Sequence, residues 1–67
     1  MNIILNNRPE KLEAEQLTIQ ELIELKNFTF KLLVTKINGK LIKKENRSNT
    51  TIHEGDDVAV IHLISGG

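Results

Sequence analysis

The sequence has no cysteine, and this absence excludes several kinds of chemistry. Without thiols the chain forms no disulfide, offers no thiolate to a metal ion and supplies no sulfur nucleophile of its own. A small domain without disulfides fits a reducing compartment better than secretion, so we expect a cytoplasmic protein. The first residues lack a basic segment followed by an apolar run, and no signal peptide is expected.

Aromatic residues, long apolar runs and an excess of charge of one sign are also missing. Phe28 and Phe30 are the only aromatic residues, which leaves no platform on which nucleic-acid bases could stack. No stretch approaches the roughly 18 apolar residues of a membrane-spanning helix. Nine basic and nine acidic residues cancel, which argues against a general nucleic-acid binder. A local basic cluster, interrupted by Glu45, favours a solvated loop over an RNA patch; its members are Lys40, Lys43, Lys44 and Arg47.

The first half of the chain predicts a hairpin followed by one helix, within a single domain over 1–67. An apolar run at 3–5, turn residues at 6–9 and alternation at 11–14 predict the hairpin, with Pro9 at its turn or edge. Thr18 and Glu21 form a capping box that starts a helix. This helix is expected to end near residues 26–27 and to turn three apolar residues toward the core: Ile19, Leu22 and Ile23.

The second half predicts three more strands. Residues 30–37 are rich in apolar and β-branched side chains, and Asn38-Gly39 predicts a tight hairpin turn before a short return strand at 41–42. Beyond it the sequence predicts a polar surface loop, a turn and a final apolar strand, at residues 43–51, 54–57 and 58–64. One helix on one face of a mixed sheet of four to five strands is an α+β arrangement, and the order of elements matches the β-grasp, or ubiquitin-like, architecture.

The sequence ends in Ser65-Gly66-Gly67. Residues without side chains add little to a core, but glycine lets a backbone thread where side chains would collide. Such a tail, expected to be flexible over about residues 65–67, presents one unhindered carboxylate. The alternatives are a frayed terminus or a remnant of cloning.

Several segments, taken in their order and spacing, resemble the ThiS family of bacterial sulfur carriers over the whole chain. They are Ile3-Ile4-Leu5-Asn6-Asn7, Thr18-Ile19-Gln20-Glu21-Leu22-Ile23, Ile37-Asn38-Gly39 with Leu41-Ile42, Glu54-Gly55-Asp56-Asp57-Val58, and Ser65-Gly66-Gly67. The resemblance implies a protein substrate of thiamine biosynthesis, a monomer when free, rather than an enzyme. It implies no catalytic residue, metal or cofactor of the chain's own and no contact with nucleic acid or membrane.

The resemblance also implies the partners and the acceptor. In this family a ThiF-like adenylating enzyme uses ATP to adenylate the terminal glycine carboxylate, and sulfur from a cysteine desulfurase relay converts it to a thiocarboxylate. A ThiG-like thiazole synthase then takes the sulfur. Carried onto this chain, the acceptor is Gly67, and Ser65 and Gly66 thread the tail into the partner's active site.

The last strand is apolar on both faces. The family comparison suggests that Val58 and Val60 point inward, which leaves Ala59, Ile61 and Leu63 partly exposed. An exposed apolar strip beside a reactive tail is a candidate surface for partner docking. The alternative is a central strand covered on both sides, but a single helix covers a single face, which favours docking.

The remaining chemistry-bearing residues favour structural roles. His53 and His62 lack the spacing of a metal-binding pair, and no cysteine could complete a site. Asp56 and Asp57 lie in a glycine-containing turn, where carboxylates usually bond to the nearby backbone rather than act as a catalytic pair.

Two alternative functions stay open. The first is a sulfur carrier for molybdopterin, tRNA thiolation or cysteine formation; the second is a ubiquitin-like conjugated tag or interaction module. The short chain and the segments around Asn38-Gly39 and 54–57 favour the thiamine carrier. Molybdopterin carriers tend to be longer, with an aromatic residue and a proline before the glycines, and these are missing here.

Overall fold

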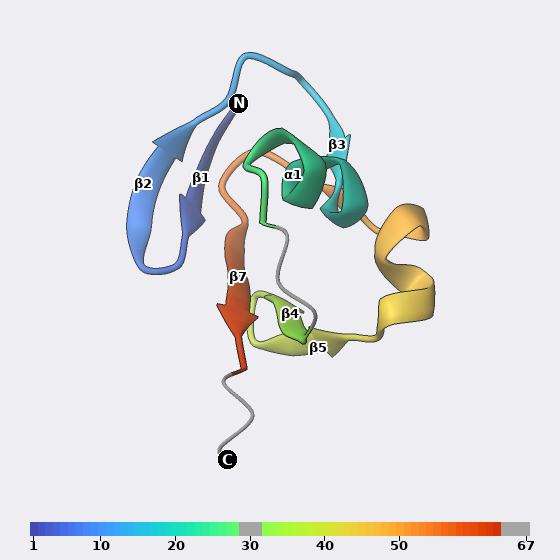
Figure 1. The fold of residues 1–67 in the computed structure, drawn as a ribbon. Coiled ribbons are helices and arrows are strands. Elements are labelled where there is room, and N and C mark those ends of the chain that lie inside the picture. The colour runs from blue at the N-terminus through green and yellow to red at the C-terminus, as the bar shows by residue number, and fades with distance from the viewer. Residues whose placement is uncertain (29–31, 64–67) are drawn as a thin grey trace.

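The computed structural model describes residues 1–28 and 32–63, and in it a short helix lies over one side of a mixed sheet (Figure 1). The sheet has five strands in the order β2-β1-β7-β4-β5. They are β1 Asn2–Leu5, β2 Arg8–Lys11, β4 Leu33–Ile37, β5 Lys40–Ile42 and β7 Asp57–His62. β1 and β7 pair in parallel, and the other neighbours pair antiparallel. The predicted α+β arrangement is confirmed.

The N-terminal hairpin is confirmed, but its second strand begins earlier than predicted. Asn6 and Asn7 both have positive φ, 51° and 67°, which is the backbone of a two-residue tight turn. β2 therefore begins at Arg8 directly after the turn, and the strand expected at 11–14 is wrong. Leu12 follows β2 and is buried in the core at 4% exposure. Pro9 lies in β2, an edge strand, where its missing N–H costs no sheet hydrogen bond.

Helix α1, Ile19–Leu25, starts at the predicted capping box. The backbone N–H of Glu21 donates to Thr18 Oγ1 at 3.1 Å, and the N–H of Thr18 donates to Glu21 Oε1 at 2.9 Å. Past its end, Asn27 takes a φ of 56°, as expected for a helix that stops there. Within the described ranges, no helix is long and apolar enough to cross a membrane.

Two short strands that the sequence did not predict hold the start of the helix. β3, Leu17–Thr18, pairs antiparallel with β6, Thr51–Ile52. The N–H of Ile19 then donates to the carbonyl of Thr50 at 3.0 Å, so the first turn of α1 is tied to the segment before β6. Strands of two residues are too short to show an alternating pattern, which is why this pair was missed.

One apolar core lies between the helix and the sheet. It includes the three helix residues predicted to face inward, together with residues from β1, β6 and β7. Its buried members in the described part of the chain are Ile3, Leu5, Leu12, Ile19, Leu22, Ile23, Ile52, Val58 and Val60. The helix has seven residues and could not persist alone, so this shared core is what keeps it folded.

The hairpin of β4 and β5 is confirmed at its turn. Asn38 and Gly39 have φ of 51° and 83°, the positive values that a tight turn of this kind requires. β4 begins at Leu33, and residues 30 and 31 of the strand predicted over 30–37 lie outside the described ranges.

The segment after β5 differs from the predicted irregular surface loop. It forms a 3-10 helix, η1, over Lys44–Asn49, and Arg47 turns inward to 9% exposure. The Nε of Arg47 donates to Thr35 Oγ1 at 3.1 Å, and the Nη2 of Arg47 donates to the carbonyl of Leu33 at 2.6 Å. The hydroxyl of the fully buried Thr35 donates in turn to the carbonyl of Ile42 at 2.7 Å. The sequence could not indicate this, because Arg47 finds its acceptors on a strand far from it along the chain.

We predict that Arg47→Ala lowers the free energy of unfolding by about 2 to 3 kcal/mol, because it leaves the acceptors on β4 without their charged donor. Lys44→Ala, at an exposed position of the same 3-10 helix, should change it by less than about 0.5 kcal/mol. Denaturant unfolding followed by circular dichroism measures both variants. Equal small losses would show that the hydrogen bonds of Arg47 add no net stability.

Candidate functional site

Strand β7 leads to the C-terminal residues, and β4 holds it along most of its length. The pairing runs from Val58 opposite Ile37 to His62 opposite Leu33. It continues past the strand, where the N–H of Leu63 donates to the carbonyl of Leu32 at 3.0 Å. Leu63 is the last residue described, so the predicted acceptor and tail, residues 65–67, lie outside the described ranges.

The other side of β7 is held by β1 and then by one asparagine. Leu5 pairs with Val58, and the N–H of Asn6 donates to the Val58 carbonyl at 2.9 Å. The side chain of Asn6 then accepts a hydrogen bond from the N–H of Val60, with 2.8 Å between nitrogen and Oδ1. Asn6 therefore gives β7 an acceptor just beyond the point where β1 ends.

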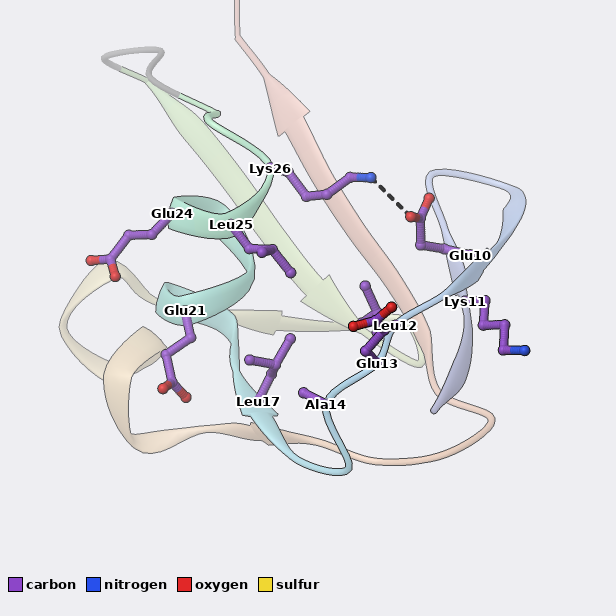
Figure 2. Close-up of a pocket in the computed structure, with 10 residues that line it drawn as sticks. All are labelled: Glu10, Lys11, Leu12, Glu13, Ala14, Leu17, Glu21, Glu24, Leu25 and Lys26. Atoms are coloured by element: carbon purple, nitrogen blue, oxygen red, sulfur yellow. Dashed lines mark hydrogen bonds and ion pairs between the residues drawn. The ribbon is translucent and has the colours of Figure 1, made fainter.

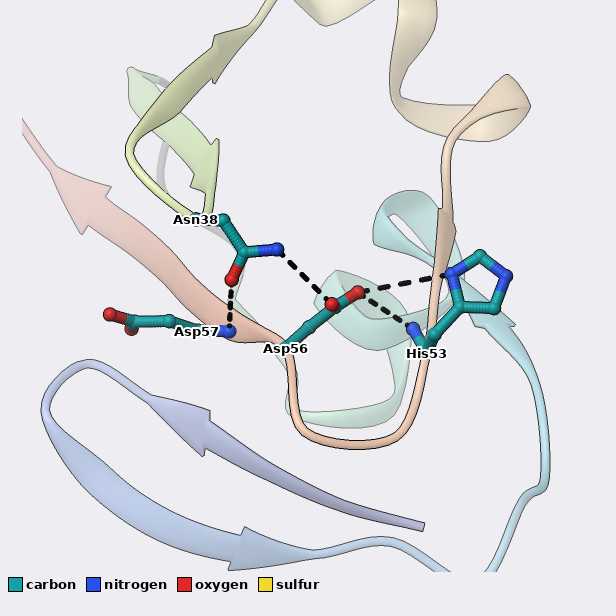
Figure 3. Close-up of polar contacts among 4 residues, drawn as sticks. All are labelled: Asn38, His53, Asp56 and Asp57. Carbon is teal, nitrogen blue, oxygen red and sulfur yellow. Dashed lines mark hydrogen bonds and ion pairs between the residues drawn. The ribbon is translucent and has the colours of Figure 1, made fainter.

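Asn38 and Asp56 join the start of β7 to the β4–β5 turn (Figure 3). Asn38 Oδ1 accepts from the N–H of Asp57 at 2.9 Å, and Asn38 Nδ2 donates to Asp56 Oδ1 at 3.2 Å. Asp56 Oδ2 accepts from the N–H of His53 at 2.8 Å and lies 3.9 Å from the His53 ring Nδ1. The carboxylate of Asp56 thus serves the turn, as predicted, whereas Asp57 takes part through its backbone and its side chain points away.

These acidic and histidine side chains do not form a metal site. Over residues 1–28 and 32–63, no group of three or more His, Cys, Asp and Glu side chains lies close enough to hold an ion. His53 is exposed and contacts Asp56 alone among these groups, and His62 is exposed near the end of β7.

The two faces of β7 differ as expected. Val58 and Val60 are buried at 0% and 6% exposure, and they pack in the core with α1. On the opposite face Ala59 is half-buried, and Ile61 and Leu63 are 45% and 47% exposed. The helix covers one side of the sheet only, so the predicted apolar strip is accessible (Figure 1).

The pairing register extends this strip across neighbouring strands. Val34 on β4 lies opposite Ile61, and Lys36 lies opposite both Ala59 on β7 and Leu41 on β5. Directly paired residues share a face of the sheet. We call this surface the open face and define it by six residues: Ile4, Val34, Lys36, Leu41, Ala59 and Ile61.

Sequence reasoning found only the part of the open face that lies on β7. Ile4 and Leu41 are 37% and 57% exposed, and Val34 is half-buried. Alternation within β1, β4 and β5 predicts which residues of each strand lie on the same face. It does not say which strands are neighbours or how they are aligned, and both are needed to join them to Ile61.

A second concave surface lies on the helix side, between α1 and residues 10–14 (Figure 2). Leu12, Leu17 and Leu25 line its interior, and acidic side chains lie around it. An ion pair between Lys26 Nζ and Glu10 Oε2, 2.8 Å apart, crosses one end. We call this surface the helix groove.

The order of the strands, helix α1 on one side of the sheet and the β1–β7 parallel pair define a ubiquitin-like β-grasp domain. The model of the ThiS family matches residues 3–67, and the chain belongs to that family. The resemblance seen in the sequence and the predicted β-grasp fold are both confirmed.

Solved structures similar to the chain include two from one organism. The crystal structure of the thiamine biosynthesis protein ThiS from Geobacter metallireducens is 30% identical, with a TM-score of 0.86 and full coverage (100%) of both chains. The NMR solution structure of a thiamine biosynthesis protein from the same organism is also 30% identical, with a TM-score of 0.80, and the match covers 100% of this chain and 88% of that one. No curated protein matches the sequence.

We predict that Asn6→Gly lowers the free energy of unfolding by about 1 to 2 kcal/mol, because it removes the acceptor of the Val60 N–H. Glycine tolerates the positive φ of this position, so the loss reports the side chain rather than the turn. Asn7→Gly is the matched control, with the same left-handed backbone and no side-chain hydrogen bond found within the described residues.

Hydrogen exchange and denaturant unfolding measure this difference. The Val60 amide should exchange faster in the Asn6 variant and at its normal rate in the Asn7 variant. Equal effects of the two substitutions would mean that the turn, and not the side-chain bond to β7, sets the stability.

Proposed function

We propose that the chain is a sulfur carrier protein of thiamine biosynthesis and that the carboxylate of Gly67 is its sulfur acceptor. The observation that carries the proposal is the family match, which runs through residue 67 and so includes the terminal glycines. The whole-chain similarity to a thiamine biosynthesis protein supports the pathway. In this role the chain is a co-substrate of other enzymes and catalyses no step itself.

The chemistry requires activation of a poor electrophile. A carboxylate is a resonance-stabilised anion, so one of its oxygens first attacks the α-phosphorus of ATP, and pyrophosphate leaves. In the resulting acyl-adenylate, AMP is a good leaving group. A sulfide-level sulfur then attacks the carbonyl carbon and AMP departs with the former carboxylate oxygen, which leaves a thiocarboxylate.

Partner enzymes and an external thiol provide every other component of this reaction. A ThiF-like adenylating enzyme binds the ATP, and a ThiG-like thiazole synthase receives the sulfur. A cysteine desulfurase relay supplies that sulfur as a persulfide, and the external thiol provides the two electrons that bring it to the sulfide level. The carrier supplies a carboxylate on two residues without side chains, which suits a narrow channel into an enclosed nucleotide site. The lack of cysteine in the chain fits this division, because the sulfur nucleophile comes from outside.

The open face supports docking beside the tail. Ala59 and Ile61 lie on β7, and Leu63 directly follows it toward Gly67. Residues on the neighbouring strands widen the exposed apolar area. Contiguous apolar surface of this kind, exposed on a small domain, marks an interaction site. A partner that covers the open face would hold the end of β7 at the mouth of its own active site.

We predict that the acceptor can be identified by intact mass. Incubation with the cognate adenylating enzyme, ATP and a sulfur donor should add about 16 Da, since sulfur replaces oxygen in this reaction. A chain without Gly67, or with one residue added after it, should show no such shift. Thiolation of the extended chain without prior trimming would exclude the terminal carboxylate as the acceptor.

We also predict that Ile61→Asp weakens binding to the adenylating enzyme by at least about 2 kcal/mol, a loss typical of an interface hot spot. The thermal melt should stay intact, because this side chain is exposed. Leu25→Asp is the control: Leu25 is 59% exposed but lies in the helix groove, so its replacement should leave binding unchanged.

A titration and a melt on each variant separate the outcomes. Lost binding with an intact melt supports the open face as the docking surface. A collapsed melt for Ile61→Asp would mean that this residue stabilises the fold, and a loss of binding by Leu25→Asp would move the interface to the helix side.

A further inference from the structure

Asn38 is the one asparagine of the chain that is followed by glycine. Asparagine is a chemically labile residue, and a following glycine favours its deamidation, because no side chain hinders attack by the glycine nitrogen on the asparagine side chain. Both residues of the turn are exposed, and the space where a Cβ of Gly39 would lie is open. The reacting atoms are therefore accessible to water.

Deamidation at this position consumes one water and releases one ammonia, without oxidation or reduction. The backbone nitrogen of Gly39 loses its proton and forms a bond to Cγ of Asn38, and the side-chain nitrogen leaves as ammonia. The product of this step is a five-membered succinimide. Water then adds to one of the two ring carbonyls and the bond from that carbon to nitrogen breaks, which gives either aspartate or isoaspartate at position 38.

The backbone of the β4–β5 turn opposes this ring closure. Asn38 and Gly39 have φ of 51° and 83°, and Ile37 pairs with Lys40 on either side of them. In the left-handed conformation the nitrogen of the following residue lies roughly opposite Cβ across the Cα–C bond, too far from Cγ to attack. Ring closure requires a large rotation about this bond, so the turn has to open first.

Two hydrogen bonds also hold the side chain of Asn38 (Figure 3). The N–H of Asp57 donates to Asn38 Oδ1 at 2.9 Å, and Asn38 Nδ2 donates to Asp56 Oδ1 at 3.2 Å. The first bond draws electron density away from Cγ and by itself would favour attack. Protection therefore comes from geometry, because the amide is fixed between the turn and the start of β7 and cannot follow a rotation of its backbone while both bonds last.

We propose that Asn38 is a site of deamidation through a succinimide, and that its hydrogen bonds to Asp56 and Asp57 keep it unreacted until the β4–β5 turn opens. The inference does not depend on the proposed function. An exposed turn opens at a lower free energy than the core, so the opening that permits the reaction is local and leaves the rest of the domain folded.

The modification weakens the contact between this turn and β7. A carboxylate at position 38 has no N–H to donate to Asp56, and two carboxylates held this close repel each other. Isoaspartate also adds one carbon to the main chain of a two-residue turn, which disturbs the pairing of Ile37 with Lys40. The backbone amide of Asp57 should therefore exchange its hydrogen faster in the deamidated chain than in the unmodified one.

The experiment incubates the full chain at physiological temperature and neutral pH and follows deamidation by peptide mapping. Each event adds about 1 Da, and chromatography separates the aspartate and isoaspartate products. The test variant is Asp56→Ala, which removes the acceptor of the Asn38 amide. Arg47→Ala is the matched control, because it destabilises the whole domain through Thr35 and Leu33 without a contact to the turn. Thermal melts of both variants check that the fold is retained.

Asp56→Ala should speed deamidation at position 38 about 10-fold, and Arg47→Ala should speed it less than about 2-fold. A second measurement needs no variant: the wild-type rate should stay nearly constant at urea concentrations below the unfolding transition, since local opening exposes little surface. Equal acceleration by the two variants, or a wild-type rate that rises with urea as steeply as unfolding does, would overturn the proposal. A folded chain that reacts as fast as the denatured chain would also overturn it.

Discussion

The short helix α1, the one α-helix of the described residues, is the constraint on which the rest of the structure depends. Seven residues of α1 lie over one side of a five-stranded sheet, and the described residues leave the other side of that sheet uncovered. The covered side takes Val58 and Val60 into the core with Ile19 and Leu22, and the uncovered side keeps Ile61 accessible. A domain this small cannot supply a second layer, and a partner protein can use the face that remains.

The sequence correctly predicted the features that depend on interactions between neighbouring residues. Thr18 and Glu21 satisfy each other's backbone within three residues, and Asn38-Gly39 supplies the positive φ of a turn by itself, so both were predicted correctly. The features that the sequence did not predict depend on contacts between residues that are distant in the sequence. Arg47 was expected in a solvated loop but donates to Thr35 and Leu33, and the open face was found only on β7, because strand order and register come from the assembled fold.

Contacts between residues distant in sequence also hold β7, the strand that leads to the proposed acceptor. β4 and β1 pair with β7 from its two sides. Where β1 ends, the Asn6 side chain accepts a hydrogen bond from the N–H of Val60. At the start of β7, the Asn38 side chain accepts a hydrogen bond from the backbone N–H of Asp57. The polar side chains of Asn6 and Asn38 therefore act as supports of β7. This arrangement suits the proposed role, in which a carboxylate is presented from a rigid domain and the catalytic groups belong to partner enzymes.

The role as sulfur donor to thiazole formation is tested most directly by following a heavy isotope of sulfur. The chain is thiolated with labelled sulfur, freed of the donor and mixed with the cognate thiazole synthase and its other substrates for a single turnover. If Gly67 carries the sulfur, mass spectrometry finds the label in the thiazole product, and the chain loses its labelled thiocarboxylate. Label that stays on the chain while thiazole forms with unlabelled sulfur would contradict the role.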